Sequence, residues 1–218
     1  MDLSPFLKNI SIYAIPLLLA ITLHEVAHGW TARYFGDRTA EMLGRLSLNP
    51  LRHIDPIGTL LVPGLLLAVG GPLFGWAKPV PVATSALRSP RRAMIMVALA
   101  GPAANLLMAA LWCGVLAAAA RVNVNQTLDF WIDSMAQAGI LTNVIRAVFN
   151  LLPIPPLAGG RVLAGLLPPR AAARLEKIEP FGLFVVLGLS VLGMFSWLFN
   201  PAFRAVGHVI LALMGTAA

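Results

Sequence analysis

The sequence predicts an all-α integral membrane protein with about six transmembrane or re-entrant segments and a short extended, β-like segment near residues 75–82. Two observations carry this prediction. Of the 218 residues, 58% are hydrophobic and only 11% are charged, against about 25% charged in average soluble domains. So small a charged fraction cannot cover the surface of a water-soluble globule. The apolar residues also fall in runs long enough to cross a bilayer.

Six apolar stretches approach the length that a membrane-spanning helix needs, about 20 residues for a bilayer core about 30 Å thick. They cover residues 10–30, 57–76, 93–120, 130–152, 181–199 and 203–214. The second is interrupted by prolines and glycines, so we expect either a bent span or a re-entrant segment whose irregular backbone is covered by protein or water. The fourth ends in a proline cluster, and the sixth is short enough to lie at the interface.

The charge pattern fits membrane loops better than a nucleic-acid surface. The net charge is +7, yet the basic residues stand singly between apolar runs, and no basic stripe is interleaved with aromatic side chains. Short loops beside membrane spans carry lysine and arginine that contact anionic headgroups and set orientation. We therefore expect the lipid bilayer as a partner, no nucleic acid, and an N-terminus in the cytoplasm.

The run His24-Glu25-Val26-Ala27-His28 lies inside the first apolar stretch and has the spacing of a zinc-binding helix. Residues four apart share a helix face, so both imidazoles can present a ring nitrogen to one zinc ion. Glu25 can take a proton from zinc-bound water and pass it to a leaving amine. The alternative interpretation is a chance match with two core histidines. Against it, an ionisable glutamate among apolar residues costs several kcal/mol unless it has a partner or a function.

A census of acidic residues and histidines strengthens this interpretation. Of the nine acidic residues, only Glu25 lies deep in an apolar stretch, and Asp133 lies near the start of one. Two of the four histidines flank Glu25, and His208 is expected at the interface. Catalytic zinc usually has three protein ligands and a water, so a third ligand is expected from another segment.

The chain resembles the site-2 protease family of intramembrane zinc metalloproteases, in its short bacterial form. The resemblance rests on HEVAHGW at 24–30, HIDPIGT at 53–59, GWAKPVPV at 75–82, AGPAAN at 100–105 and NLLPIPPLAGGR at 150–161. It implies one membrane-embedded metalloprotease domain over residues 1–218, with core motifs at 20–165 and C-terminal helices at 181–216. It also implies a multi-pass protein of the bacterial inner membrane.

The resemblance implies an endopeptidase that cuts a transmembrane segment of a membrane-protein substrate, as in regulated intramembrane proteolysis. One zinc ion per chain would be held by His24 and His28, with Glu25 as the catalytic residue. Asn150 and Asn105 would bind substrate or orient the developing oxyanion. The segment 75–82 would add a strand to unwound substrate, with a plain connecting loop as the alternative. The oligomeric state is not predicted.

One position departs from the family pattern. The family motif reads N-x-x-P-x-P-x-L-D-G, with the aspartate as third zinc ligand, and this chain has Ala158 there. Alanine has no atom that binds a metal, so we expect weakened zinc binding and a chain that is inactive or strongly impaired. One loss in an otherwise intact motif is what a deliberate Asp→Ala change would produce. A natural pseudoprotease that binds membrane helices without cutting is the alternative.

Two further interpretations stay open on the sequence alone. His53 or Asp55 could substitute for the missing ligand, because their loop follows the first helix; local hydrogen bonding or capping is the alternative for His53. A channel or transporter with a polar intramembrane site would also use intramembrane histidines and broken helices. Zinc content that depends on His24 and His28 would separate a protease from a transporter.

Overall fold

The computed structural model describes residues 3–62, 64–65, 78–122, 125–182 and 194–213, and over these ranges it is helical, with no strand. The elements, in chain order, are α1 (Leu3–Tyr34), α2 (Thr39–Met42), η1 (Pro50–Arg52), η2 (Pro56–Leu61), η3 (Thr84–Ala86), α4 (Pro90–Ala119), α5 (Gln126–Asn150), α6 (Ala158–Leu166), α7 (Pro169–Glu176), η4 (Glu179–Phe181) and α9 (Met194–Leu213). The prediction of an all-α chain is confirmed at this level.

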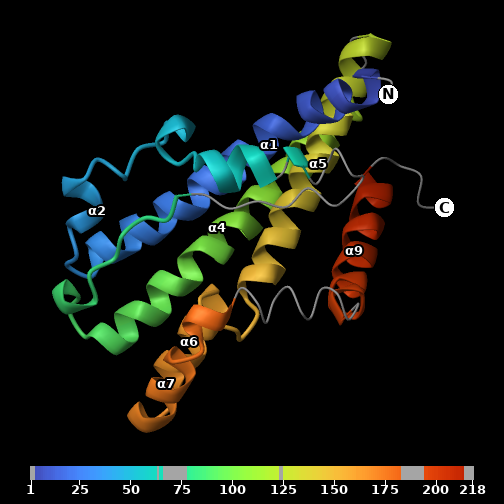
Figure 1. Cartoon of the computed structure of the whole chain (residues 1–218). Coiled ribbons are helices and arrows are strands. Elements are labelled where there is room, and N and C mark those ends of the chain that lie inside the picture. Colours follow the sequence, from blue (N-terminus) through green and yellow to red (C-terminus); the bar gives the residue numbers. More distant parts are fainter. Residues whose placement is uncertain (1–2, 63, 66–77, 123–124, 183–193, 214–218) are drawn as a thin grey trace.

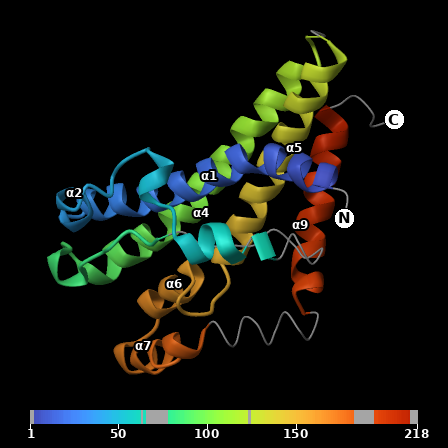
Figure 2. The ribbon, with the colours of Figure 1, turned by 45° about the horizontal axis from the view of Figure 1, so that its top comes forward.

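Three long helices, α1, α4 and α5, pack against one another and form the centre of the molecule. Figure 1 shows α4 running beside α1 in the opposite direction and α5 returning along α4. In the rotated view of Figure 2, α9 lies beside α5 on the side away from α2, and α6 and α7 lie at the end where α5 finishes. This arrangement brings the middle of α1 against the middle of α4.

Small residues allow the central helices to approach closely. Gly139 on α5 lies under the ring of Trp112 on α4, and a Cβ at this glycine would stand 2.5 Å from ring atoms Cε2 and Cγ of that tryptophan. Near this crossing, Leu116, Ala136, Ile140 and Val206 form a buried apolar cluster joining α4, α5 and α9. Close backbone approach through small residues is typical of helix packing in membranes.

Two of the described helices are long and apolar enough to cross a membrane: residues Leu7–Tyr34 of α1 and Pro90–Ala119, which is α4. They match the predicted stretches 10–30 and 93–120, and α5 matches 130–152. The number of six spans stays a prediction. Of the stretch 57–76, the structure describes only the beginning, where η2 is a π-helix whose N-terminal residues follow Asp55.

The predicted break between 181–199 and 203–214 is wrong. Helix α9 runs without interruption from Met194 to Leu213, with Pro201 inside it. Proline removes one backbone hydrogen bond and kinks a helix, but packing of the helix against neighbours can carry it past that point. Here α9 packs on both α5 and α4. The preceding residues 183–193 of the predicted fifth stretch lie outside the described residues.

The predicted β-like segment 75–82 is described only from residue 78 onward. Residues 78–83 belong to neither a helix nor a strand. The Lys78 N–H donates to the His53 carbonyl at 3.0 Å, which ties the segment to the loop after α2. An extended, strand-like role for this segment therefore stays a prediction.

Candidate metal centre

Two histidine side chains of α1 face each other where α1 crosses α4. The Nε2 atoms of His24 and His28 are 3.0 Å apart, and His24 is only 4% exposed. The Nδ1 atom of His24 lies 2.6 Å from Asn105 Oδ1, and the Nδ1 atom of His28 lies 2.6 Å from the Val97 carbonyl oxygen. Both partners are on α4, so the neighbouring helix orients both rings.

These contacts determine which ring nitrogen carries the proton. A backbone carbonyl oxygen only accepts, so His28 donates through Nδ1–H to Val97. The Asn105 Oδ1 atom also accepts, so His24 donates through Nδ1–H. Each neutral ring then presents an unprotonated Nε2, the form in which histidine binds metals. Two such lone pairs 3.0 Å apart repel, and either a cation between them or a small separation of the rings relieves this repulsion.

Gly101 of α4 leaves the space beside the paired nitrogens open. A Cβ at this position would stand 2.6 Å from His24 Cε1 and 2.7 Å from His24 Nε2, and closer still to His28 Nε2. The predicted small-residue motif at 100–105 is thus part of the site as well as of the helix packing. Its glycine gives room to the two imidazoles, and its asparagine orients one of them.

Glu25, between the two histidines, is held from the opposite side. Its Oε2 accepts a hydrogen bond from the Val80 N–H at 2.8 Å. Arg45 secures that segment, because its Nη2 donates to the Lys78 carbonyl at 2.7 Å. The Glu25 carboxylate also interacts electrostatically with Arg146, Arg45 and Arg161. The backbone hydrogen bond from Val80 thus holds the carboxylate at one edge of the histidine pair.

The region of the missing ligand lies at the start of α6. Helix α5 ends at Asn150, whose Nδ2 donates back to the Arg146 carbonyl at 2.9 Å. Ala158 is the first residue of α6 and is buried, 6% exposed. The predicted break of the fourth helix at the proline cluster is confirmed. The roles of Asn150 in substrate binding and of position 158 in metal binding stay predictions.

His53 and Asp55, considered as substitute ligands, make local contacts. The His53 side chain is fully buried, and its Nε2 donates to the Ser47 carbonyl at 2.7 Å. Burial lowers the pKa of its imidazole, with the charge of Arg45 acting in the same direction. Asp55 caps η2 by accepting from the N–H groups of Ile57 and Gly58. In the described part of the chain, no three His, Cys, Asp or Glu side chains lie close enough to hold a metal ion.

Two residues near the site were missed by the sequence analysis, and both are on α5. Asn143 is fully buried and bonded to Asn105. Arg146 interacts electrostatically with both Glu25 and His24. Arg146 had a sequence signal, since it is a cation deep in the stretch 130–152, and intramembrane charges mark functional sites. The census of acids and histidines does not count arginine. Asn143 had no comparable signal.

Two facing histidines on a long apolar helix, with a glutamate between them, have the arrangement that the H-E-x-x-H pattern of zinc metalloproteases requires. The sequence profile described as Peptidase family M50 matches residues 12–138. The chain therefore belongs to this family, the site-2 protease family of zinc metalloproteases, as the resemblance predicted.

Similar proteins agree with this assignment. YwhC of Bacillus subtilis, named as a candidate zinc metalloprotease, is 38% identical over 201 residues, covering 91% of this chain and 89% of that protein. Rip2 of Mycolicibacterium smegmatis, named in the same way, is 35% identical over 80% of this chain and 64% of its own length. Rip2 of Mycobacterium tuberculosis is 33% identical over 84% of this chain and 71% of its own length. No solved structure matches the chain.

The residues present fit zinc in part. Tetrahedral zinc with bonds of about 2.0–2.1 Å holds two imidazole nitrogens roughly 3.3 Å apart. The observed Nε2–Nε2 distance of 3.0 Å needs only a small outward movement of the rings to reach that value. The two histidines thus supply two ligands in the correct tautomer. Among the described residues, no third His, Cys, Asp or Glu side chain joins them.

Proposed function

We propose that this chain is built as an intramembrane zinc endopeptidase that cuts a transmembrane segment of a membrane-protein substrate. We also propose that Ala158 leaves it inactive or strongly impaired. One observation carries the proposal: the Nε2 atoms of His24 and His28 face each other 3.0 Å apart, with both Nδ1 atoms committed to acceptors on α4. Their depth in an apolar helix supports cleavage within the membrane, and membership of a zinc metalloprotease family supports the chemistry.

The roles of the chain's own residues follow from their positions. A bound zinc ion would supply Lewis acidity, which makes water a nucleophile near neutral pH. Glu25, adjacent to both histidines, would accept the proton of that water and deliver it to the leaving amine. The Val80 N–H keeps the Glu25 carboxylate in place. The cationic side chain of Arg146 would favour negative charge developing on the substrate carbonyl oxygen. Asn150 would bind substrate from the end of α5.

The Ala158→Asp variant tests this proposal. We expect it to bind one zinc ion per chain, by metal analysis of the purified full chain, and to gain cleavage of a transmembrane reporter peptide in liposomes. Ala158→Asn, which has the same shape and no carboxylate, should gain much less. Adding Glu25→Gln to Ala158→Asp should keep the zinc and remove the cleavage. No gain in zinc content in folded Ala158→Asp protein would overturn the assignment of position 158.

A natural pseudoprotease is the second candidate, and Ala158 is the observation that favours it. In that case the chain would bind membrane helices without cutting them, and its partner would be the same class of transmembrane segment. Ala158→Asp protein that binds zinc and the reporter peptide, yet does not cleave it, would favour this function over proteolysis.

A further inference from the structure

A chain of two buried amides connects the histidine face of α1 to helix α5. Asn105 on α4 and Asn143 on α5 are both fully buried. Asn105 Oδ1 lies 2.6 Å from His24 Nδ1, and Asn105 Nδ2 donates to Asn143 Oδ1 at 2.9 Å. Asn143 Nδ2 then donates to the Gly139 carbonyl at 2.9 Å. Three helices thus contribute to one line of hydrogen bonds that ends on a histidine.

The two ends of this chain fix its direction. An amide side chain can be turned over, exchanging its donor and its acceptor, so an isolated asparagine does not determine the form of a neighbouring histidine. The Gly139 carbonyl only accepts, so Asn143 must direct its Nδ2 toward it and its Oδ1 toward Asn105. Asn105 must then direct its Nδ2 toward Asn143 and its Oδ1 toward His24. The Ala20 carbonyl, 3.2 Å from Asn105 Nδ2, favours the same orientation.

The direction of the chain decides whether His24 can bind a metal. With Oδ1 facing it, His24 carries its proton on Nδ1 and leaves Nε2 unprotonated toward His28. If Asn105 were turned over, its N–H would face Nδ1, and the neutral ring would carry its proton on Nε2, where a metal would bind. Residues behind a metal ligand that fix its tautomer typically change metal affinity about 10–100-fold when removed.

We propose that Asn143 is a positioning residue of the metal centre, which fixes the Nδ1–H tautomer of His24 by holding the Asn105 amide in one orientation. It touches neither substrate nor metal. The role rests on the proposed function only for the identity of the metal and the reaction. The tautomer itself depends on neither, so it can be tested whether or not the chain is a protease.

His28 provides an internal control within the same protein. Its Nδ1–H donates directly to the Val97 carbonyl, and no amide lies between them. A change at Asn143 should therefore alter the tautomer of His24 and leave the His28 proton on Nδ1, whereas a general loss of structure would alter the tautomers of both rings. This difference separates a positioning role from a merely structural one.

The experiment measures imidazole 15N chemical shifts of the full chain, without metal, in lipid nanodiscs with 15N-labelled histidine. We expect both His24 and His28 to show the Nδ1–H form in the unaltered chain. Asn143→Leu should introduce the Nε2–H form at His24 alone. Asn143→Asp should keep the Nδ1–H form, because its buried carboxyl in the protonated form donates to the Gly139 carbonyl and still accepts from Asn105 Nδ2. Thr142→Val removes a buried polar group from the neighbouring position of α5 and should change neither ring.

Zinc affinity supplies the second readout, measured by chelator competition on the Ala158→Asp background. Asn143→Leu should weaken zinc binding about 10-fold, the lower end of the usual range because Ala20 still favours the native orientation. Asn143→Asp should keep most of the zinc affinity of the Ala158→Asp chain. If the leucine variant does not fold, Asn143→Ala removes the same acceptor with less bulk. An unchanged His24 spectrum in a folded variant lacking the acceptor would overturn the proposal. A shift of both His24 and His28 to the Nε2–H form in Asn143→Leu would also overturn it.

Discussion

At the scale of single residues, Gly101 is a position where helix stability favours alanine but the space beside the two histidines requires glycine. Inside a helix, alanine is favoured over glycine by about 1 kcal/mol. At position 101, however, a Cβ would occupy the space beside both Nε2 atoms. The same helix contains Gly114, where a Cβ would meet nothing within 4 Å. The two glycines therefore respond in opposite ways to the same substitution.

We predict that Gly101→Ala weakens zinc binding by about 100-fold or more on the Ala158→Asp background, because direct obstruction exceeds the usual effect of a residue behind a ligand. Gly114→Ala should leave zinc affinity unchanged and raise the thermal midpoint. Chelator competition and thermal unfolding in the same detergent measure both. Equal zinc affinity of the two alanine variants would show that the metal does not lie beside Gly101.

At this scale, the sequence predicts which side chains share a helix face but not which partners on other helices they contact. The spacing of His24, Glu25 and His28 predicts a shared helix face, and the structure confirms it, since the two rings meet. The ring partners, Asn105 and the Val97 carbonyl, are 81 and 69 residues away along the chain. No local pattern encodes contacts of that range. They follow from how α1 packs on α4, which composition alone does not determine.

At the scale of elements, the connection between α1 and α4 depends on one carboxylate. Asp37 is 1% exposed; its Oδ1 accepts from the Thr39 N–H and its Oδ2 from the Ala83 N–H at 2.7 Å. It therefore joins the end of α1, the start of α2 and the segment that leads into α4. Burial alone would raise the pKa of this carboxyl, but the hydrogen bonds from Thr39 and Ala83 outweigh burial and lower it.

A carboxyl whose pKa is lower in the folded protein stabilises it at pH values above the unfolded pKa, and this contribution is lost as pH falls through the folded pKa. The unperturbed value is 3.8. We predict that Asp37→Asn lowers stability by about 1.5–3 kcal/mol at pH 7, the range for hydrogen bonds to a charged group. The difference should shrink steadily below pH 3.8. Thermal unfolding of both proteins at several pH values measures it.

The partly exposed carboxylate Glu41 provides the control for this prediction. It pairs with Arg33 and Arg38 on the surface, where ion pairs contribute little. Glu41→Gln should leave the thermal midpoint unchanged at neutral pH. A loss in Asp37→Asn that is the same at pH 7 and at the acidic end would show that the charge of Asp37 is not what holds these elements together.

The helices themselves were largely predictable from apolar run length, which found α1, α4 and α5. Apolar run length fails at one proline. The predicted stretches stop at residue 199 and resume at 203, yet Pro201 between them lies inside α9. Whether proline ends a helix or only kinks it depends on the packing around it, and here α5 and α4 supply that packing. The prolines after Asn150, in contrast, do end α5.

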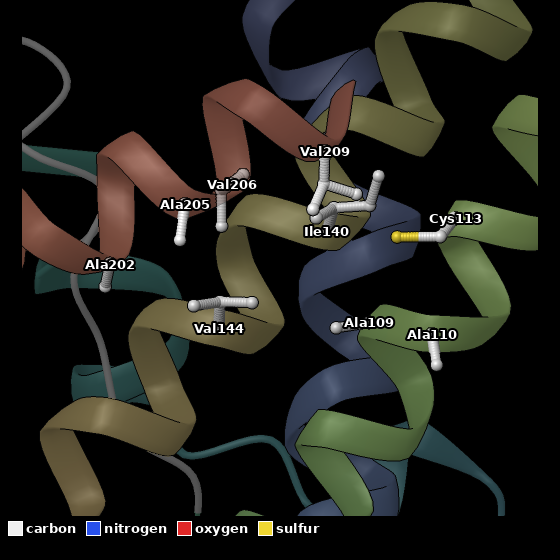
Figure 3. A pocket seen from close by; sticks show the side chains of 9 residues that line it. All are labelled: Ala109, Ala110, Cys113, Ile140, Val144, Ala202, Ala205, Val206 and Val209. Atoms are coloured by element: carbon white, nitrogen blue, oxygen red, sulfur yellow. The ribbon is translucent and has the colours of Figure 1, made fainter. Parts of the chain in front are cut away.

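At the scale of the whole molecule, the helices enclose the candidate site on one side and leave an apolar cavity on another. The cavity, of about 230 Å³, lies among α4, α5 and α9 (Figure 3). Its lining residues are Ala109, Ala110, Cys113, Ile140, Val144, Ala202, Ala205, Val206 and Val209. An open cavity with so little polar surface is compatible with contact to lipid chains, and it contains the only cysteine of the sequence.

This cysteine makes the membrane position of the bundle testable without altering the sequence. A nitroxide attached to Cys113 of the full chain in nanodiscs should collide readily with dissolved oxygen, which concentrates in lipid, and rarely with a water-soluble nickel chelate. The apolar lining and the place of Cys113 in the candidate span Pro90–Ala119 are the physical reasons. The control label is attached through Ser85→Cys in a Cys113→Ser background. It should collide readily with the nickel chelate and rarely with oxygen, because Ser85 lies exposed in η3, outside both candidate spans. Strong nickel collisions at Cys113 would show that the face formed by α4, α5 and α9 meets water, and helix α1 would then need a different placement in the bilayer.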